Sequence, residues 1–257
     1  MSIFAGLLTA VALAASPVTL PPTAGPADYQ LGGAYPPASK VQIVTRDRTD
    51  APAAGVYSIC YVNSFQTQPG RLGWWKTNHP SLLLRDKNRR LVRDRNWPDE
   101  VLLDLRTSKK RAALARINRT WFDRCQRAGF QAVEPDNLDS WTRSRKLIKK
   151  SQAVRYAKRL VRQAHRSKLA IAQKNAPQLS RSGIGFDFAV AEECEVYREC
   201  GRYTRAYGTR LIEIEYTDNG RKAFNRACAA RRGKASIVLR DRDVVPAGAR
   251  GYRYATC

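Results

Sequence analysis

The sequence lacks most of the short motifs that announce a cofactor site or an activated nucleophile. Neither G-x-G-x-x-G nor G-x-x-x-x-G-K-[ST] follows any of its apolar segments, which weakens dinucleotide and nucleotide binding. No G-x-S-x-G, H-E-x-x-H or EF-hand loop is present. There is no C-x-x-C pair, and the two histidines, His79 and His165, are far apart in the sequence. We therefore expect no metal and no cofactor.

The chain also has no apolar run of the ~18–20 residues that a membrane span needs. The nearest, at residues 3–15, has the length of a signal-peptide core and offers an Ala-Leu-Ala cleavage site at residues 12–14, although no Lys or Arg precedes it. We expect a signal peptide over residues 1–15, a Pro-rich segment over 16–27 and a secreted, extracellular protein. The alternative is a buried N-terminal helix.

Acidic residues are scarce, because 22 Asp and Glu stand against 46 Lys and Arg, for a net charge of +24 over 257 residues. A hydrophobic content of 43% is nevertheless globular. The positive surplus is greatest over residues 106–181, with 21 basic and 4 acidic residues. This surplus indicates either solvated helix faces or a surface for anionic envelope polymers or nucleic acid.

What the sequence does contain is a series of short apolar segments separated by longer stretches. They lie at residues 29–33, 41–47, 56–63, 101–105, 132–137, 169–175, 186–190, 211–216 and 236–241. Helical spacing of apolar residues predicts one helix that ends at Gly129 and another over about residues 147–164. The pattern favours a single-domain (β/α)8 barrel, with one of the nine segments misread or outside it. A doubly wound open sheet is the alternative.

Carboxylates collect at the ends of these segments, where a barrel places its active site. Alternation predicts that Glu134 and Asp136 face the barrel interior while Val133 faces outward. The same rule predicts that Lys174 faces inward. In residues 211–216 it predicts Ile212 and Ile214 outside and Glu213 and Glu215 inside.

Closely spaced carboxylates raise one another's pKa, so that one acid can stay protonated beside an ionised partner. Such a pair is what glycosidic bond cleavage requires. Trp74, Trp75, Trp97 and Trp141 fall in loops, where they either stack on sugar faces or anchor loops on the barrel. The sequence therefore indicates a glycoside hydrolase.

The run G-F-Q-A-V-E-P-D-N-L-D at residues 129–139 resembles the GFDGVEPDNxD signature of glycoside hydrolase family 114, the endo-α-1,4-polygalactosaminidases. Further matching runs occur in the order in which the family has them. They are W-P-D-E at 97–100, F-D-F-A-V at 186–190, a Glu-rich Cys motif at 192–194 and E-Y at 215–216. The resemblance covers residues 28–257 and is especially close to the secreted actinobacterial branch of that family.

The resemblance implies a (β/α)8 barrel over residues 28–257 that hydrolyses α-1,4-linked galactosamine polymers with two carboxylates. Asp136 matches one catalytic position and is expected to be the nucleophile or base. Glu192 matches the other and is expected to be the acid/base, although A-E-E-C replaces the family's N-E-Q-C and leaves a choice between Glu192 and Glu193. The remaining residues expected at the substrate are Asp104, Glu134, Asn137, Asp139, Lys174, Asn175, Glu193, Glu215 and Tyr216.

Six cysteines in a secreted chain predict up to three disulfides, and spacing alone allows 15 pairings. We expect Cys194–Cys200 and Cys228–Cys257 as local pairs, which leaves Cys60–Cys125. The expected partner is a polysaccharide rather than a membrane or nucleic acid, and the expected state is a monomer. The competing hypothesis is a secreted basic protein that binds carbohydrate or anionic polymers on a barrel whose catalysis has decayed.

Overall fold

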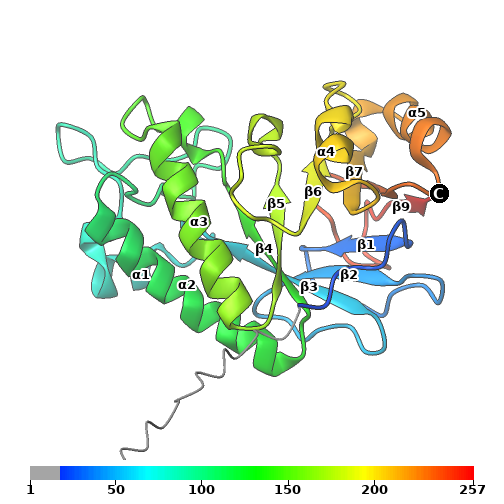
Figure 1. Cartoon of the computed structure of the whole chain (residues 1–257), viewed down its shortest axis with the longest axis horizontal. Helices are drawn as coiled ribbons and strands as arrows, with labels where there is room; N and C mark the ends of the chain where they lie inside the picture. The colour runs from blue at the N-terminus through cyan, green and yellow to red at the C-terminus, as the bar shows by residue number, and fades with distance from the viewer. Residues whose placement is uncertain (1–17) are drawn as a thin grey trace, which may run out of the picture.

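Eight parallel strands follow one another around a barrel in the computed structural model, which describes residues 18–257 (Figure 1). They are β1 Ala27–Gln30, β2 Ile43–Asp47, β3 Tyr57–Asn63, β4 Ala132–Asp136, β5 Ala170–Lys174, β6 Phe188–Glu192, β7 Leu211–Tyr216 and β8 Ser236–Arg240. A ninth strand, β9 Tyr254–Thr256, which the sequence did not indicate, pairs antiparallel with β8. The predicted barrel is confirmed, and the open doubly wound sheet is not adopted.

The barrel is closed between β1 and β8 by side chains. Arg240, on β8, is fully buried and donates hydrogen bonds to the Asp28 carboxylate at 3.1 Å and to the backbone carbonyl of Tyr29, both on β1. Tyr254 on β9 adds a hydrogen bond to the carbonyl of Ala27 at 3.1 Å. Within the described strands, the backbone ladder runs from β1 to β9 and does not join β1 to β8.

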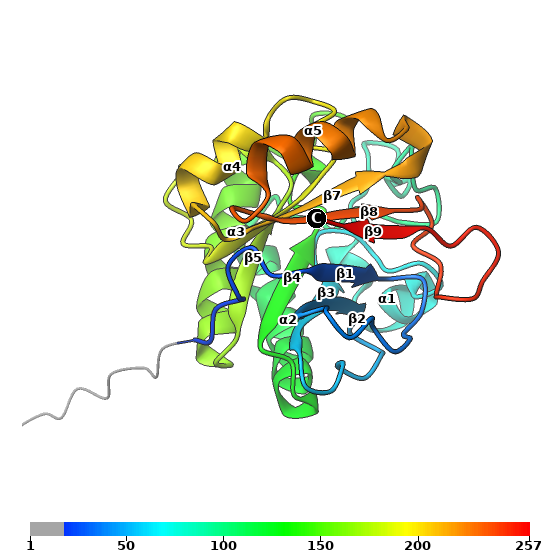
Figure 2. The same ribbon diagram turned by 90° about the vertical axis from the view of Figure 1, so that its right-hand side faces the viewer.

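Helices cover the barrel unevenly. After β3 and β4 come the long helices α2 Ser108–Ala128 and α3 Lys150–Arg166, which pack side by side, whereas α4 Cys200–Tyr207 and α5 Lys222–Arg231 lie at the other end of the sheet (Figures 1 and 2). The Thr107 side chain caps α2 by accepting from the backbone N–H of Lys110, and Gly129, at φ 104°, ends it as the sequence predicts. The short elements are α1 Leu72–Asn78, η1 Pro80–Leu82, η2 Ser140–Thr142, η3 Pro177–Leu179 and η4 Thr217–Asn219.

The segment at residues 101–105 is the one misread as a barrel strand. It belongs to a long excursion between β3 and α2, residues 64–107. There Val101, Leu102 and Leu103 form isolated antiparallel bridges with residues 93, 66 and 83 of the same excursion. Its apolar side chains are buried in the layer that α2 and α3 share with the excursion. Burial there requires the same residue types as a barrel strand, so composition alone does not separate the two.

Alternation predicts the inward and outward faces correctly for β4 and β5 but not for β7. Val133 packs outward against the α2–α3 layer, as expected. On β7, however, Ile212 and Ile214 face the barrel interior, and Glu213 and Glu215 face outward beneath α4 and α5. The prediction for these four residues is wrong because Arg231 of α5 reaches in to pair with Glu213 at 2.9 Å, so the outer layer holds a buried charge pair there.

Three disulfides link the six cysteines, and the expected pairing is confirmed. Cys60–Cys125 ties β3 to α2, Cys194–Cys200 closes the loop before α4, and Cys228–Cys257 ties α5 to the C-terminal strand. The expected signal peptide lies outside the described residues. None of the described helices combines the length and the apolar character that crossing a membrane requires.

Candidate active site

A pocket of about 580 Å³ opens at the carboxyl ends of the strands, within the ~300–1,000 Å³ typical of ligand sites. Strands β1 to β7 each contribute a lining residue, in order Tyr29, Asp47, Tyr61, Asp136, Lys174, Glu192 and Tyr216. Residues of the 64–107 excursion and of the loop after β8 complete the wall. The parallel register thus brings together side chains that are almost 190 residues apart in sequence, at the rim where barrel enzymes hold their chemistry.

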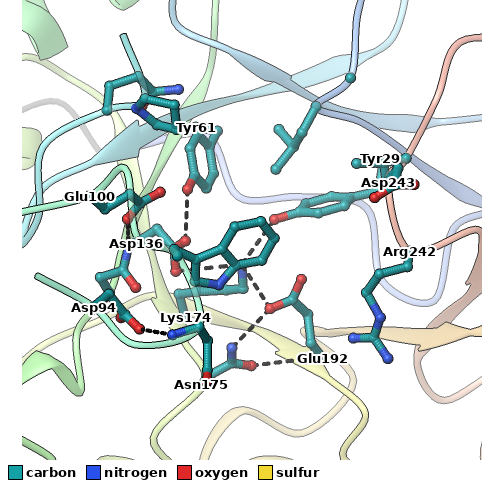
Figure 3. A pocket seen from close by; sticks show the side chains of 18 of the residues that line it. Tyr29, Tyr61, Asp94, Glu100, Asp136, Lys174, Asn175, Glu192, Arg242 and Asp243 are labelled. Carbon is teal, nitrogen blue, oxygen red and sulfur yellow. Dashed lines mark hydrogen bonds and ion pairs between the residues drawn. The ribbon is translucent and has the colours of Figure 1, made fainter. Parts of the chain in front are cut away.

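Lys174 lies at the centre of the pocket floor (Figure 3). Its side chain is 2% exposed, and its ammonium nitrogen lies 3.1 Å from Glu134 Oε1, 3.3 Å from Glu192 Oε2 and 3.6 Å from Asp136 Oδ1. Burial lowers the pKa of this amine, but Asp136, Glu192 and Glu134 together raise it well above its ordinary value. Lys174 is therefore a permanent positive charge shared by three carboxylates.

Asp136 ends β4 and is held in its ionised form. Burial raises its pKa, but this is outweighed by the charge of Lys174, the Tyr61 hydroxyl that donates to Oδ2 at 2.7 Å, and the backbone N–H of Asn137, so the net shift is downward. Asn137 takes the left-handed backbone conformation, with φ 66°, that turns the chain out of the strand. The result is a partly buried carboxylate that is negatively charged near neutral pH.

Glu192 ends β6 and is oriented by Asn175 and Tyr216. Asn175 donates to Glu192 Oε2 at 3.0 Å and accepts from the Glu192 backbone N–H at 2.8 Å, while the Tyr216 hydroxyl donates to Oε1. Because Glu192 and Asp136 both lie within 4 Å of the same ammonium nitrogen, the oxygens facing it can be no farther apart than the sum of 3.3 and 3.6 Å. The two carboxylates thus face each other across a narrow gap.

Glu193, the other member of the pair left open by the sequence, has a different environment. It is bound by Arg242 at 2.7 Å and by Asn219, and the hydrogen bond from Arg242 is the main reason that its pKa is lowered. Its backbone is also left-handed, with φ 57°, so its side chain turns away from the direction of Glu192. The side chain that lies near Lys174 is that of Glu192.

The other residues expected at the substrate divide into two groups. Those that line the pocket are Asn137, Asp139, Lys174, Asn175, Glu193 and Tyr216, while Asp104, Glu134 and Glu215 do not line it. Asp104 is fully buried near the start of α2 and pairs with Arg106 at 2.7 Å. Glu215 lies on the outer face of β7, where it accepts from the backbone N–H of Glu195 at 2.9 Å.

Glu134 sits just below the pocket floor. It is fully buried, it accepts the Tyr29 hydroxyl at 2.6 Å, and Tyr29 in turn accepts a hydrogen bond from Lys174 at 2.9 Å. Burial raises the pKa of Glu134, although Lys174 and Tyr29 oppose the shift. Glu134 therefore fixes the position of Lys174 from beneath rather than meeting a ligand itself.

Several lining residues were not singled out from the sequence as site residues. These are Tyr29, Tyr61, Asp47, Asp94, Glu100, Arg143, Arg242 and Asp243. In sequence, Tyr29 and Tyr61 look like ordinary inward-facing core residues of a barrel strand. Their role at the site is shown only by the hydrogen bonds from their hydroxyls to Glu134 and Asp136. Trp97 and Glu100 do stand in the W-P-D-E run at residues 97–100 noted above. Burial, Asp136 and Asp94 raise the pKa of Glu100 to about 7, while the hydrogen bond from Asn63 opposes them.

The tryptophans expected in loops also separate. Trp97 is 57% exposed at the pocket, in a position to stack on a sugar. Trp74 and Trp75 lie on helix α1 rather than in a loop and line a different pocket, while Trp141 lies in η2 and packs against the apolar core.

The pocket is acidic although the chain as a whole is strongly basic. Its lining has eight carboxylates and three cations, Asp47, Asp94, Glu100, Asp136, Asp139, Glu192, Glu193 and Asp243 against Arg143, Lys174 and Arg242. Among the described residues, the one group of side chains spaced for a metal ion is Cys194, Cys200 and Glu213. Its two cysteines are joined in a disulfide, so they offer no thiolate ligands.

The comparisons with known proteins agree with this geometry. The model of glycoside-hydrolase family GH114 matches residues 8–257. Ega3 of Aspergillus fumigatus, crystallised with galactosamine, has a similar structure, with a TM-score of 0.73 and 21% identity over 94% of this chain and 100% of that one. The glycoside hydrolase domain of PelA from Pseudomonas aeruginosa has a TM-score of 0.63 and 14% identity over 87% of this chain and 97% of that one. No curated protein sequence is significantly similar to this chain.

Proposed function

Because the chain belongs to glycoside-hydrolase family GH114 and is a glycoside hydrolase, we propose that it cleaves α-1,4-linked galactosamine polymers within the chain. The observation that carries this substrate is the excess of eight carboxylates over three cations around the pocket of a protein with net charge +24. A free amino sugar is protonated near neutral pH, so it is attracted to this lining while the rest of the molecule repels it. The galactosamine bound to Ega3, a protein of the same fold, is consistent with that preference.

For the chemistry, we propose Asp136 as nucleophile and Glu192 as acid/base. In the first step Glu192 gives its proton to the glycosidic oxygen, the bond from that oxygen to the anomeric carbon breaks, and Asp136 bonds to the anomeric carbon. In the second step a water molecule gives a proton to Glu192, its oxygen attacks the anomeric carbon, and Asp136 is released. The low pKa of Asp136 and the position of Glu192 beside Tyr216 and Asn175 support these roles.

The short gap between the two carboxylates supports retention of anomeric configuration. Retaining enzymes place them about 5–5.5 Å apart and inverting enzymes about 6.5–9.5 Å. For the two oxygens that face Lys174, the upper limit of 6.9 Å admits the whole of the first range and only the lower end of the second. We expect the first-formed reducing end to be the α-anomer, observed by proton NMR before mutarotation. A β-anomer would contradict the nucleophilic role of Asp136.

The proposal is tested by an end-product assay on partially deacetylated α-1,4-galactosaminogalactan. We expect oligosaccharides from the wild type and a loss of at least about 10³-fold in kcat for Asp136→Asn and Glu192→Gln, since both remove a group that acts in the transition state. Glu193→Gln is the matched control and should retain most of kcat. If all four proteins are folded and none releases product, the substrate is wrong; product from Asp136→Asn at the wild-type rate would exclude that residue.

The three disulfides favour an oxidising compartment, which supports the proposal of a secreted protein. The competing hypothesis of a decayed binding protein is less well supported. Buried Lys174 still has all three of its carboxylate partners in place, an arrangement that binding alone does not require.

A further inference from the structure

A second pocket, of about 230 Å³, lies beside the active-site pocket and has an unusual lining. The residues that characterise it are Trp74, Trp75 and Trp121 together with Arg48, Arg71 and Arg124. We call it the tryptophan–arginine pocket. Its volume is below the ~300–1,000 Å³ of sites for drug-sized ligands, so it suits a single ring rather than an oligomer.

One wall of this pocket is aromatic. Trp74 and Trp75 meet edge to face with ring centroids 5.1 Å apart, and Trp121 lies 6.0 Å from Trp75. Trp75 and Trp121 are buried and therefore fixed, whereas Trp74 is 39% exposed. The ring open to the apolar face of a sugar is therefore that of Trp74, which the two buried tryptophans hold in place, so that stacking on it costs little entropy.

The other wall is cationic, and its lining includes no carboxylate. Arg48, Arg71 and Arg124 line the pocket, and no Asp or Glu does. Arg48 stacks on Trp121 with its guanidinium carbon 4.6 Å from the ring centroid. Burial lowers the pKa of Arg48, and repulsion from Arg71 and Arg124 adds to the effect while Asp47 offsets part of it. An anion placed among these guanidinium groups would relieve their repulsion.

Guanidinium groups bind carboxylate and phosphate oxygens through paired N–H donors. An aromatic wall and a cationic wall together therefore match a ring that carries such a group. We propose that the tryptophan–arginine pocket binds a pyranose that bears a carboxylate or phosphate substituent. The proposal does not depend on the substrate assigned to the active site.

The tryptophan–arginine pocket adjoins the acidic pocket. Gln68 lines both pockets, and it donates to Asp47 of the acidic pocket at 3.0 Å. Two adjoining pockets of opposite charge therefore share one wall. A protonated amino sugar is attracted by one and repelled by the other, and the reverse holds for an acidic sugar.

The test is titration calorimetry on the full chain with methyl β-glucuronide and with galactose 6-phosphate, which separate the carboxylate from the phosphate. We expect at least one of them to bind saturably and about tenfold or more tighter than methyl galactoside. Arg48→Gln and Arg124→Gln should each weaken that binding about tenfold, since each removes a charge-assisted hydrogen bond. Arg127→Gln, an exposed change on α2 outside the pocket, is the matched control.

A second readout separates this pocket from the active site. Binding should change the tryptophan fluorescence, and Trp74→Phe should reduce the change, whereas Glu192→Gln should leave both the affinity and the signal unaltered. The proposal is overturned by a lack of saturable binding of both anionic probes, or by equal binding of methyl galactoside. It is also overturned if inorganic phosphate binds as tightly as galactose 6-phosphate, or if Arg124→Gln binds like the wild type.

Discussion

Lys174 determines the electrostatics of the active-site pocket at the scale of single residues. Three carboxylates share its ammonium group, and two of them, Asp136 and Glu192, are the proposed catalytic pair. The sequence placed Lys174 on the inner face of its segment, and the family resemblance placed it near the substrate. Neither indicated Tyr29 and Tyr61, because an inward tyrosine on a barrel strand has the same sequence pattern as a core residue. Their roles depend on hydroxyl contacts made between strands that are distant in sequence.

Removing the charge of Lys174 should move the acidic limb of the pH–rate profile. In Lys174→Met the burial of Asp136 remains while its principal cation is lost, so the pKa of Asp136 rises and the acidic limb of kcat/KM shifts upward by about 1–3 pH units. Because the carboxylates are coupled, the limb reports the cluster rather than one group.

The same variant removes the cation that pairs with the fully buried Glu134 and with the partly buried Asp136 and Glu192, a change that costs about 3–5 kcal/mol of unfolding free energy. Lys174→Arg keeps the charge and serves as the control, with urea unfolding beside the kinetics. An acidic limb that stays in place in a folded Lys174→Met protein would show that Lys174 does not set the protonation state of the nucleophile.

At the scale of helices and strands, the positions of most elements were predicted from the sequence, but the orientation of one strand was not. Eight of the nine apolar segments are barrel strands, and Gly129 ends α2, because strand burial and helix termination are local effects. The predicted inward and outward faces of β7 were wrong because Glu213 pairs with Arg231 of α5, a tertiary contact that the local sequence pattern does not show. The place of Asp94 and Glu100 in the pocket lining was likewise not predicted. The 64–107 excursion that carries them is held by isolated bridges between residues distant from one another in sequence.

The outward face of β7 carries a pH-dependent stability. Burial, with help from Glu213 and other nearby carboxylates, raises the pKa of Glu215 to about 7 in the folded protein. In the unfolded chain the group titrates near 4.3, so the native state binds more protons between these two values and the stability contribution is lost as pH rises through about 7. The effect on the unfolding free energy is at most about 4 kcal/mol, since each pKa unit is worth about 1.4 kcal/mol.

We expect Glu215→Gln to gain stability relative to the wild type between pH 5 and pH 8, because Gln keeps the acceptor for the Glu195 N–H and cannot ionise. Urea unfolding at the two pH values measures the difference. Glu213→Gln, which loses an ion pair with Arg231, should instead be destabilised at both. An offset between wild type and Glu215→Gln that is the same at pH 5 and pH 8 would contradict the shifted pKa.

Over the whole molecule, negative and positive charges lie in different places. The active-site pocket is acidic, while the helices α2 and α3 carry much of the positive charge on the outside of the barrel, and α3 contains no acidic residue. A strongly positive protein repels a cationic substrate at long range. The structure separates the two charges in space, with the positive surplus on the outer helices and the carboxylates around the pocket.

That separation predicts an unusual dependence on salt. The Debye length shortens from about 30 Å at 0.01 M to about 10 Å at 0.1 M, so added salt screens the distant positive charge more than the contacts inside the pocket. We expect kcat/KM on the deacetylated polymer to rise several-fold over this range, with little change on a fully N-acetylated one. A steady fall from the lowest salt concentration would mean that attraction by the pocket dominates at long range.

Because Arg240 and Tyr254 close the barrel by side-chain contacts, β1 should separate from β8 more readily than other neighbouring strands separate from each other. Everywhere else around the barrel, separating two strands breaks a ladder of backbone bonds, whereas between β1 and β8, as the structure describes them, no ladder exists and the strands are joined by side-chain contacts, with one backbone bond from Gly32 to Val244 beyond their ends. Transient breathing should therefore start at this seam, and the amide protons of β1 should exchange with deuterium sooner than those of β3 and β4. Since Tyr29 lies on β1 and holds Glu134 and Lys174, each opening would briefly loosen the charged floor of the catalytic pocket.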